Sequence, residues 1–235
     1  MKIHRFISDF ENIHDEIIVD TPDLVHQIVR VLKLQKGEKI ILCDGNGKDV
    51  YAEIVETNKH FIKLKKEKEM ESLPELKRKI HLYCALLKAD NFDLVVQKAT
   101  ELGVTEITPL ITHRTIRKNV REDRLQRVAQ EAAEQCGRGF VPTVSPIVHF
   151  DSFVKKIDET DVNLFFDVGA PVFSGKFLGE KKEINIFIGP EGGWSEEEKH
   201  LLNTDIFLPV SISPFVLRGE TAAIAACSMV AHFVV

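Results

Sequence analysis

Two short segments near the end of the 235-residue sequence contain the residues whose types and spacing could do chemistry. Residues 188–194 (Ile-Gly-Pro-Glu-Gly-Gly-Trp) form a glycine-rich turn that carries Glu191, and residues 214–223 place Arg218 and Glu220 two positions apart. Glycines let the backbone approach a ligand closely, and an arginine can stabilise negative charge that develops during a reaction. Proline and glycine also punctuate ordinary turns. An ordinary turn, however, needs no Arg-x-Glu set at the start of the most apolar stretch of the chain, so the two segments indicate a ligand site.

The elements on either side of the glycine-rich turn would present its backbone to a ligand. The apolar run of Ile184, Ile186, Phe187 and Ile188 predicts a strand before the turn. Ser195 followed by three glutamates matches a capping box, which begins a helix. Strand, glycine turn and helix start form a geometry in which backbone amides can close on a ligand.

From residue 80 onward, strand and helix patterns alternate, which predicts a parallel sheet with helices on both faces. The expected strands are 80–87, 104–111, 162–166, 184–188 and 206–210, and the expected helices are 90–102 and 121–135. Ligands bind beyond the carboxyl ends of such strands, where three loops should converge: 166–167, 189–193 and 210–213. Residues 221–235 are apolar almost all round, so we expect a helix buried within the domain or against another subunit.

Residues 1–68 have the pattern of a separate β-rich domain. Residues 39–55 read as strand, Asp-Gly-Asn-Gly turn and strand, and residues 60–65 alternate again. A short helix is expected at 23–31, after a Thr-Pro pair. These signals predict a small β-barrel with one helix, a kind of domain that usually binds a partner.

The charged stretch 66–79 contains a proline and shows no periodicity. Interdomain linkers commonly have such a composition. We therefore divide the sequence into a β-barrel domain at 1–68, a linker at 69–79 and an α/β domain at 80–235.

Composition and cysteine usage exclude several classes of protein. The apolar fraction of 44% and charged fraction of 29% are ordinary for a soluble globular protein. No apolar run approaches the roughly 20 residues that span a bilayer, and the first residues lack the apolar core of a signal peptide. The four cysteines are scattered, without a Cys-x-x-Cys pair. This pattern indicates reduced thiols in a cytoplasmic protein and predicts no metal site.

The glycine-rich turn also fails to match common catalytic motifs. No Gly-Lys-Ser/Thr follows it, and its spacing is not Gly-x-Gly-x-x-Gly. The sequence has no Gly-x-Ser-x-Gly elbow. The nine histidines do not pair with Asp or Cys at a catalytic spacing, so we expect His4, His26 and His113 to make local hydrogen bonds.

Positive charge is concentrated in two places, although the net charge of −5 provides no overall basic field for nucleic acid. The lysines between positions 59 and 68 are typical of a solvated face. Between positions 113 and 127, only Glu122 and Asp123 oppose a group of six cations: Arg114, Arg117, Lys118, Arg121, Arg124 and Arg127. Guanidinium groups suit bidentate phosphate contacts, so this second cluster is the better candidate for a nucleic-acid surface.

Together these motifs closely resemble the small-subunit ribosomal RNA uridine-N3 methyltransferase family, of the SPOUT (knotted) class. Ile-Gly-Pro-Glu-Gly-Gly-Trp-Ser-x-x-Glu from residue 188 and Phe-Val-Leu-Arg-Gly-Glu-Thr-Ala from residue 215 carry the resemblance most strongly. Ala-Leu-Leu-Lys from residue 85 and Gln-Lys-Ala-Thr-Glu-Leu-Gly-Val from residue 97 look like the same catalytic domain. His-Arg-Phe from residue 4 resembles the family's opening, ahead of a barrel related to the PUA RNA-binding fold. The likeness extends over almost the whole chain.

The resemblance implies an α/β knotted fold, with a parallel sheet flanked by helices and a deep trefoil knot in the last third, behind an N-terminal PUA-like β-barrel. It implies S-adenosylmethionine as cofactor, bound in a bent shape, and an obligate homodimer that shares its active site across the interface. The implied reaction methylates N3 of one uridine, uridine 1498 in the family, in 16S ribosomal RNA of the small subunit.

Three alternatives remain open at this point. The chain could be a SPOUT methyltransferase with another RNA target, a non-catalytic RNA-binding or ribosome-assembly protein without cofactor affinity, or a nucleotide- or phosphate-binding enzyme that uses the glycine turn for an anion. The intact Arg-Gly-Glu-Thr set at 218–221 speaks against the last two.

In the implied reaction, N3 loses its proton as the methyl group arrives, which leaves negative charge on the flanking carbonyl oxygens. We expect Arg218 to stabilise that charge and orient the base. We expect Glu191 or Glu220 to accept the proton or hold Arg218 in place, although an acidic residue at a helix N-terminus is favourable by itself. The expected cofactor-binding positions are Phe166, Ile188, Gly189, Pro190, Glu191, Gly192, Gly193, Leu208, Ser211, Leu217, Arg218 and Thr221. The positions assigned to the RNA backbone are Arg5, Arg114, Arg117 and Lys118.

Two positions depart from the family's usual pattern. Lys33 stands where the family usually has arginine, and it lacks the planar fork for a base-specific contact. Ile212 and Ser213 stand where Leu-Gly is usual, so the backbone path of that loop is left open.

Overall fold

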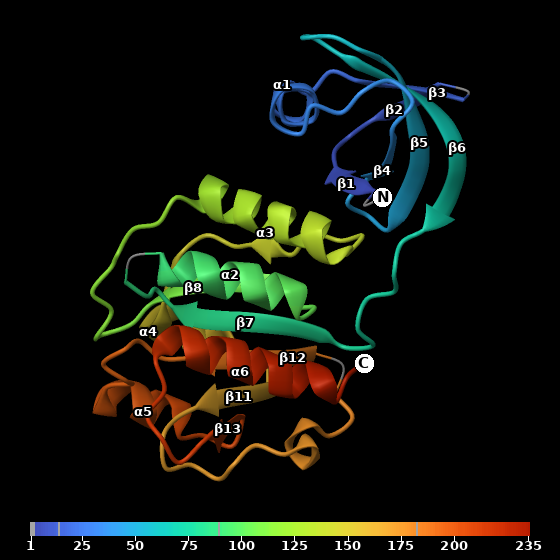
Figure 1. Ribbon diagram of the computed structural model, residues 1–235. Coiled ribbons are helices and arrows are strands. Elements are labelled where there is room, and N and C mark those ends of the chain that lie inside the picture. The colour runs from blue at the N-terminus through green and yellow to red at the C-terminus, as the bar shows by residue number, and fades with distance from the viewer. Residues whose placement is uncertain (1–2, 14, 89, 182) are drawn as a thin grey trace. The chain divides into compact units, whose positions relative to one another are not determined.

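The computed structural model describes residues 3–13, 15–88, 90–181 and 183–235. The chain forms two compact units (Figure 1). The first comprises Met1–Glu75 together with Ala133–Val141, and the second comprises Leu76–Ala132 together with Pro142–Val235. Among the described residues, no helix is long and apolar enough to cross a membrane.

The first unit is a six-stranded sheet in the order β1-β4-β5-β6-β3-β2. Its strands are β1 (His4–Ile7), β2 (Glu11–Ile13), β3 (Glu16–Val19), β4 (Lys39–Cys43), β5 (Lys48–Thr57) and β6 (Ile62–Glu71). All pairs are antiparallel except β1 with β4. The predicted hairpin is confirmed, because β4 and β5 pair directly on either side of the Asp-Gly-Asn-Gly turn.

One short helical segment packs against this sheet. It consists of α1 (Pro22–His26), which starts at a proline in its first turn, and a π-helical continuation, Gln27–Val31. Leu24, Val25 and Ile28 face inward and share one apolar core with side chains from the strands. The helix expected at 23–31 is thus confirmed.

The expectation of an irregular linker from residue 66 is wrong for its first part. Strand β6 continues to Glu71 and pairs with β5 as far as Lys48. The charged side chains of residues 67–71 are all exposed or nearly so, and a solvated strand needs no apolar alternation. Lys63 pairs with Glu16 across the sheet and Lys66 with Glu69 along the strand, which fits a solvated face for the lysine run.

The second unit contains a seven-stranded sheet in which every pairing is parallel, as predicted. The order is β10-β8-β7-β12-β11-β13, with β9 also on β8. The strands are β7 (Lys79–Ala85), β8 (Glu106–Ile111), β9 (Thr143–Val144), β10 (Val148–His149), β11 (Val162–Phe166), β12 (Glu183–Ile188) and β13 (Phe207–Val210). Only β9 and β10, two residues each, had no counterpart among the expected strands.

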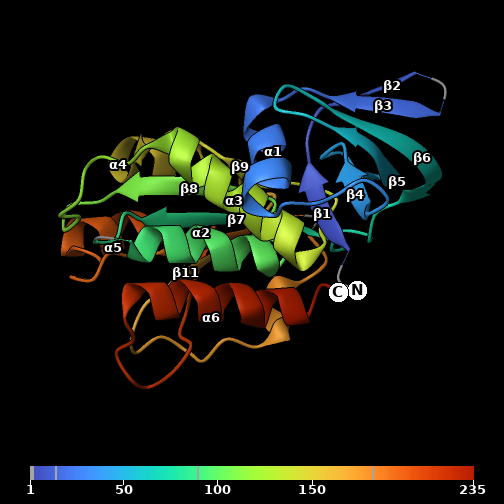
Figure 2. The ribbon, with the colours of Figure 1, turned by 45° about the horizontal axis from the view of Figure 1, so that its top comes forward.

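Helices cover both faces of the parallel sheet, again as predicted. Helix α2 (Asn91–Glu101) and helix α6 (Gly219–His232) run side by side on one face, where α6 contacts β7 and β12 (Figure 2). On the other face, α4 (Phe150–Phe153), a 3-10 turn at Val154–Lys156 and α5 (Glu196–Leu202) pack on an aromatic core. In that core Tyr83 and Phe187 stack with ring centroids 4.6 Å apart.

Helix α3 (Glu122–Cys136) begins in the second unit and ends in the first. The segment that follows it is built into the first unit by several contacts. Ala133 and Val141 cluster with Ile7 and Cys43, the amide of Gly47 donates to the carbonyl of Gly139 over 3.1 Å, and Arg138 forms an ion pair with Glu75. The first unit is therefore assembled from two separate stretches of sequence.

Candidate active site

The glycine-rich turn lies between β12 and α5, as its neighbours in sequence require. Strand β12 ends at Ile188, and a complete capping box begins α5. The Ser195 hydroxyl accepts from the amide of Glu198 over 3.2 Å, while the Glu198 carboxylate accepts from the amide of Ser195 over 2.7 Å. Gly193 has a φ of 70°, a conformation that favours glycine. The predicted order of strand, glycine turn and helix start is confirmed.

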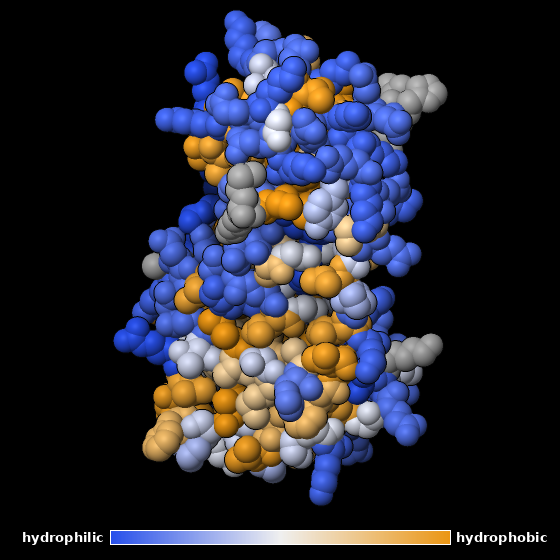
Figure 3. Space-filling view, turned by 45° about the vertical axis from the view of Figure 1, so that its right-hand side comes forward, coloured by the Kyte–Doolittle hydropathy of each residue, from blue (hydrophilic) through white to orange (hydrophobic). Residues whose placement is uncertain are grey.

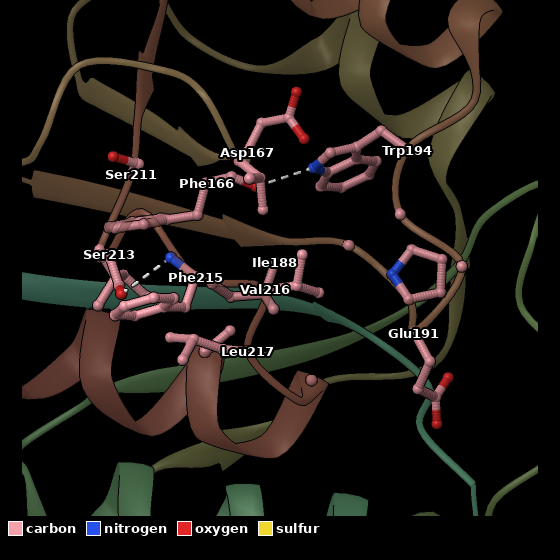
Figure 4. A pocket seen from close by; sticks show the side chains of 18 residues that line it. Phe166, Asp167, Ile188, Glu191, Trp194, Ser211, Ser213, Phe215, Val216 and Leu217 are labelled. Atoms are coloured by element: carbon pink, nitrogen blue, oxygen red, sulfur yellow. Dashed lines mark hydrogen bonds between the residues drawn. The ribbon is translucent and has the colours of Figure 1, made fainter.

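A cavity of about 270 Å³ opens at the carboxyl ends of β11, β12 and β13 (Figure 4). Its wall contains Phe166, Ile188, the whole loop 189–193, Ser211 and Leu217. The structure thus brings together nine of the twelve positions expected to bind a cofactor. It also brings together the three loops that were expected to converge at this edge of the sheet.

Three expected cofactor positions do not line the cavity. Leu208 lies in strand β13 and borders a different hollow, beside Asp161 and Gly179. Arg218 is the N-cap residue of α6, and Thr221 is exposed on its first turn. Near Arg218 the chain turns into α6, and the neighbours Leu217 and Gly219 line the cavity. Leu208, Arg218 and Thr221 stay predicted cofactor contacts.

Other residues complete the wall. The lining residues that were not named as expected cofactor contacts are Asp167, Val168, Trp194, Ile212, Ser213, Phe215, Val216, Gly219 and Ala222. Nearly all of them lie within the three strand-end loops or the 214–223 segment, so the sequence indicates the loops and not the individual side chains. Phe215 and Val216 are exposed over 73% and 83% of their surface, which gives one side of the cavity an open apolar rim.

Trp194 fixes the closed end of the glycine loop. Its side chain is 2% exposed, and its ring nitrogen donates to the carbonyl of Phe166 over 3.1 Å (Figure 4). A Cβ added at Gly189 would lie 3.0 Å from this ring, so a larger residue just after strand β12 would crowd the tryptophan. The tryptophan therefore holds the loops after β11 and β12 together.

Both candidate catalytic glutamates contact the chain around the start of α2. Glu191 lines the cavity but turns its carboxylate away from the apolar side chains of Ile188 and Val216 (Figure 4), and that carboxylate accepts from the amide of Lys88 over 3.0 Å. Glu220 is half-buried in the first turn of α6 and accepts from the side-chain amide of Asn91 over 3.2 Å.

Arg218 lies at the mouth of the cavity, between the lining residues Leu217 and Gly219. It is exposed, and among the described residues its side chain has no hydrogen-bond or ion-pair partner. A guanidinium group in this position is available to a ligand that enters the cavity from solvent.

The loop after β8 contains three of the four residues assigned to RNA. Arg114 donates from Nη1 to the carbonyl of Gly192 over 2.8 Å, so it reaches the glycine loop itself. Arg117 is half-buried and donates to the carbonyl of Asn119, and Lys118 is exposed.

Arg5 belongs to the first unit and is not available to RNA. Its side chain is about 10% exposed and forms an ion pair with Asp49, whose side chain is also buried. Its Nη2 donates to Asp49 over 2.7 Å and to Ser72 over 3.3 Å. The assignment of Arg5 to the RNA backbone is therefore corrected: the guanidinium group balances a buried carboxylate.

His113 makes local hydrogen bonds, as expected. Its Nδ1 is 3.0 Å from the Ser195 hydroxyl and its Nε2 is 2.9 Å from Asp151. The hydrogen bond to Asp151 raises the pKa of His113, because it favours the charged imidazolium.

His113, Asp151 and Glu198 also have the donor types that could hold a metal ion, and their donor atoms lie within 4.8 Å of one another. Each of these donors already has a protein partner, since the two Glu198 oxygens accept the amides of His113 and Ser195. We therefore assign the cluster to holding the loop after β8 against the start of α5.

Both units match known protein families. Residues 74–231 match the family model of an RNA methyltransferase domain, and residues 21–67 match that of an RNA methyltransferase PUA domain. The ribosomal RNA small subunit methyltransferase E of Synechocystis sp. is 31% identical over 235 residues, which is 97% of this chain and 77% of that protein. The Bacillus subtilis protein of the same name is 26% identical, over 90% of this chain and 88% of its own length.

Solved structures agree over the full length. The structure of a ribosomal RNA small subunit methyltransferase E from Neisseria gonorrhoeae, bound to S-adenosyl methionine, has a TM-score of 0.87 and 31% identity. The structural alignment covers 97% of this chain and 96% of the Neisseria gonorrhoeae chain. A methyltransferase from Legionella pneumophila in complex with the same cofactor has a TM-score of 0.89 and 31% identity, over 98% of this chain and 97% of that one.

The fold and the matched families define the class of this protein, which is an RNA methyltransferase domain joined to a PUA domain. Within that class, the chain belongs to the ribosomal RNA small subunit methyltransferase E family. The family and the fold class predicted from the sequence are confirmed.

Proposed function

We propose that this protein transfers a methyl group from S-adenosylmethionine to N3 of one uridine in the 16S ribosomal RNA of the small subunit. The observation that carries the proposal is the cavity walled by residues 189–193 at the carboxyl edge of the parallel sheet. Relatives with 31% identity and the same fold hold S-adenosylmethionine in their structures. The target base follows from the family resemblance.

The residues around the cavity fit such a cofactor. Ile188, Phe166 and Leu217 offer apolar surface to a planar base. The glycine loop offers backbone donors and acceptors where side chains would fill the space, since a Cβ at Gly189 or Gly192 would meet a neighbouring side chain within 3.3 Å. We therefore place the cofactor between the glycine loop and residues 211–217.

When bound, the cofactor supplies an activated methyl group, and the residues of this chain hold and prepare the base. We assign Arg218 to the flanking carbonyl oxygens of the uracil, where it stabilises the negative charge that appears as N3 loses its proton. Glu191 lines the cavity and Glu220 does not. We therefore assign proton acceptance to Glu191, with its carboxylate turning from the amide of Lys88 toward the base when substrate is bound. We assign Glu220 a structural role, in which it holds the start of α6 against Asn91.

We further propose that two copies of the chain form a dimer through the α6 face. Several large apolar side chains of this domain are exposed: Phe215, Val216, Phe233 and Val235. These side chains flank the two ends of α6, and exposed apolar patches commonly mark protein interfaces. In Figure 3, apolar residues gather in the lower part of the view, on the surface of the methyltransferase domain. Sedimentation velocity at micromolar concentration should give a mass near twice the 26.6 kDa of one chain, and a monomer at that concentration would overturn the dimer.

The trefoil knot, the domain limits 1–68 and 80–235, and the cytoplasmic location are also part of the proposal. The strand order supports the knot, because the chain passes from β12 over β11 to β13 and then returns across β11 to α6. An enzyme that modifies ribosomal RNA works where ribosomes are assembled, which supports the location.

Calorimetric titration of the purified protein with S-adenosylhomocysteine tests the proposal, with ATP as the control ligand. We expect micromolar binding of the homocysteine compound and none of ATP. Absence of binding would favour a non-catalytic RNA-binding protein, and tighter binding of ATP would favour a phosphate-binding enzyme. If the protein methylates a different RNA, it is still a methyltransferase, but the proposed target is wrong.

A further inference from the structure

The turn at residues 112–115, which follows β8, is fixed by its own side chains. The amide of Thr112 donates to the Thr115 hydroxyl over 3.0 Å, and the two hydroxyl groups lie 2.8 Å apart. Both threonines are 5% exposed. The two residues between them, His113 and Arg114, therefore point outward from a firmly held turn.

His113 joins this turn to the start of α5. Its amide donates to the fully buried Glu198 carboxylate over 2.8 Å, and its ring lies within hydrogen-bond distance of Ser195. Because Ser195 immediately follows the glycine loop and Trp194, the turn is held at a fixed distance from that loop.

Arg114 contacts the loop directly at Gly192. Its Nη1 donates to the Gly192 carbonyl over 2.8 Å. A Cβ added at Gly192 would lie 3.3 Å from the Arg114 Cβ and 3.4 Å from its Cδ, so the stem of the arginine occupies the space that a side chain would take. Glycine at position 192 thus leaves room for the Arg114 side chain, and the Gly192 carbonyl points toward its guanidinium group.

We propose that Arg114 is a positioning residue for the cofactor loop. By fixing the Gly192 carbonyl, it sets the peptide planes on either side of Gly192 and hence the shape of the cavity wall between Glu191 and Gly193. This role rests on the proposed function, because it concerns the loop assigned to S-adenosylmethionine. It replaces the assignment of Arg114 to the RNA backbone.

The test compares Arg114→Gln with Lys156→Gln, which removes the same charge at an exposed position of the same domain. Both are titrated with S-adenosylhomocysteine in the absence of RNA. A hydrogen bond from a charged group is worth roughly 1.5 kcal/mol or more, so Arg114→Gln should weaken binding about tenfold. Lys156→Gln should leave it unchanged. Arg114→Lys, which keeps a donor, should recover part of the loss.

The outcomes separate this inference from the proposed function. If the unsubstituted protein binds no S-adenosylhomocysteine, both fail. If it binds and Arg114→Gln binds equally well, only the positioning role is overturned, and reduced RNA affinity in that variant would return Arg114 to the RNA backbone. Steady-state kinetics should place the defect mainly in the KM for S-adenosylmethionine, with equal melting temperatures excluding a general loss of folding.

A double-mutant cycle tests the contact itself. Gly192→Ala should weaken binding of S-adenosylhomocysteine in the unsubstituted protein, because the new methyl group crowds the Arg114 stem. In the Arg114→Gly background the Cβ and the rest of the side chain are both absent, so the same substitution should cost much less. Strictly additive effects would show that Arg114 and Gly192 act independently and would overturn the proposal.

Discussion

Arg218 is exposed and lies between Leu217 and Gly219, two residues that line the cavity. Nothing in the described parts of the chain neutralises or holds its guanidinium group. Arg5, Arg114 and Arg138 each have a carboxylate or carbonyl partner within the protein. The unpartnered guanidinium group of Arg218, next to the cavity, fits the role proposed for it, which is to meet negative charge on a substrate.

We expect Arg218→Ala to lower the rate of methyl transfer by a factor of about 10²–10³, the usual loss when a group that stabilises transition-state charge is removed. The affinity for S-adenosylhomocysteine should change little. Single-turnover transfer of labelled methyl groups to small-subunit RNA measures the rate, and Lys156→Ala, an exposed cation outside the 113–127 cluster, serves as control. Full turnover by a folded Arg218→Ala protein would exclude this role.

Arg5 illustrates the opposite case, a basic residue whose partner lies inside the protein. Removing one member of a buried ion pair leaves the other charge unpaired, so Arg5→Met should lower the free energy of unfolding by about 3 kcal/mol. Urea unfolding measures this loss, with Arg30→Met, an exposed arginine of the same unit, as control. A variant of undiminished stability and reduced RNA affinity would restore the RNA assignment made from the sequence.

At the scale of the elements, the parallel sheet explains how much of the site could be predicted. Strand ends and helix starts have local signals, such as the capping box at Ser195, and these located all three loops of the cavity. Side-chain direction depends on the path of the chain between elements. For this reason Leu208, a predicted cofactor contact, borders a different hollow, whereas Trp194 lines the cavity although it was not among the predicted contacts.

The charged end of β6 shows the same limit for the fold. Apolar alternation reveals a strand only where one of its faces is buried. Residues 66–71 are paired with β5 but largely solvated, so their sequence contains no such signal. The pairing depends on β5, which lies in a different part of the sequence.

Strand β7 contains a histidine that makes the sheet sensitive to acid. His81 stacks on Tyr83 and bonds to the Thr108 hydroxyl over 2.9 Å. Burial lowers the pKa of His81 from 6.5 to about 4, against the opposing effect of Glu106 and Glu183. Because the unfolded chain binds this proton more readily, the stabilisation is complete above about pH 6.5 and is lost as the pH falls toward 4.

We therefore expect His81→Gln, which keeps a side-chain amide for Thr108, to flatten the dependence of stability on pH between about 4 and 6.5. Urea midpoints measured at intervals across that range provide the comparison, with His60→Gln, an exposed histidine of the other unit, as control. An unchanged slope would mean that His81 accepts its proton equally well in the folded and unfolded chain.

For the molecule as a whole, the net charge of −5 means that RNA affinity must come from local positive surface. Arg117 and Lys118 are the remaining candidates after Arg5 and Arg114 are assigned elsewhere. Replacing either by Gln should weaken RNA binding and reduce the slope of log affinity against log salt by roughly 0.7–0.9. Filter binding at several salt concentrations measures this, with Lys156→Gln as an exposed control. If neither variant changes the slope, the RNA surface lies elsewhere.

Because the first unit includes Ala133–Val141, the two units cannot be separated by a single cut between Glu75 and Leu76. A fragment that begins at Leu76 would retain this stretch but lose the residues that Ala133, Arg138 and Gly139 contact, namely Ile7, Glu75 and Gly47. A fragment that ends at Glu75 would lose the same contacts from the other side. No single cleavage point releases both halves intact, so recombination between relatives that exchanges one half alone would have to carry the borrowed nine-residue stretch with it.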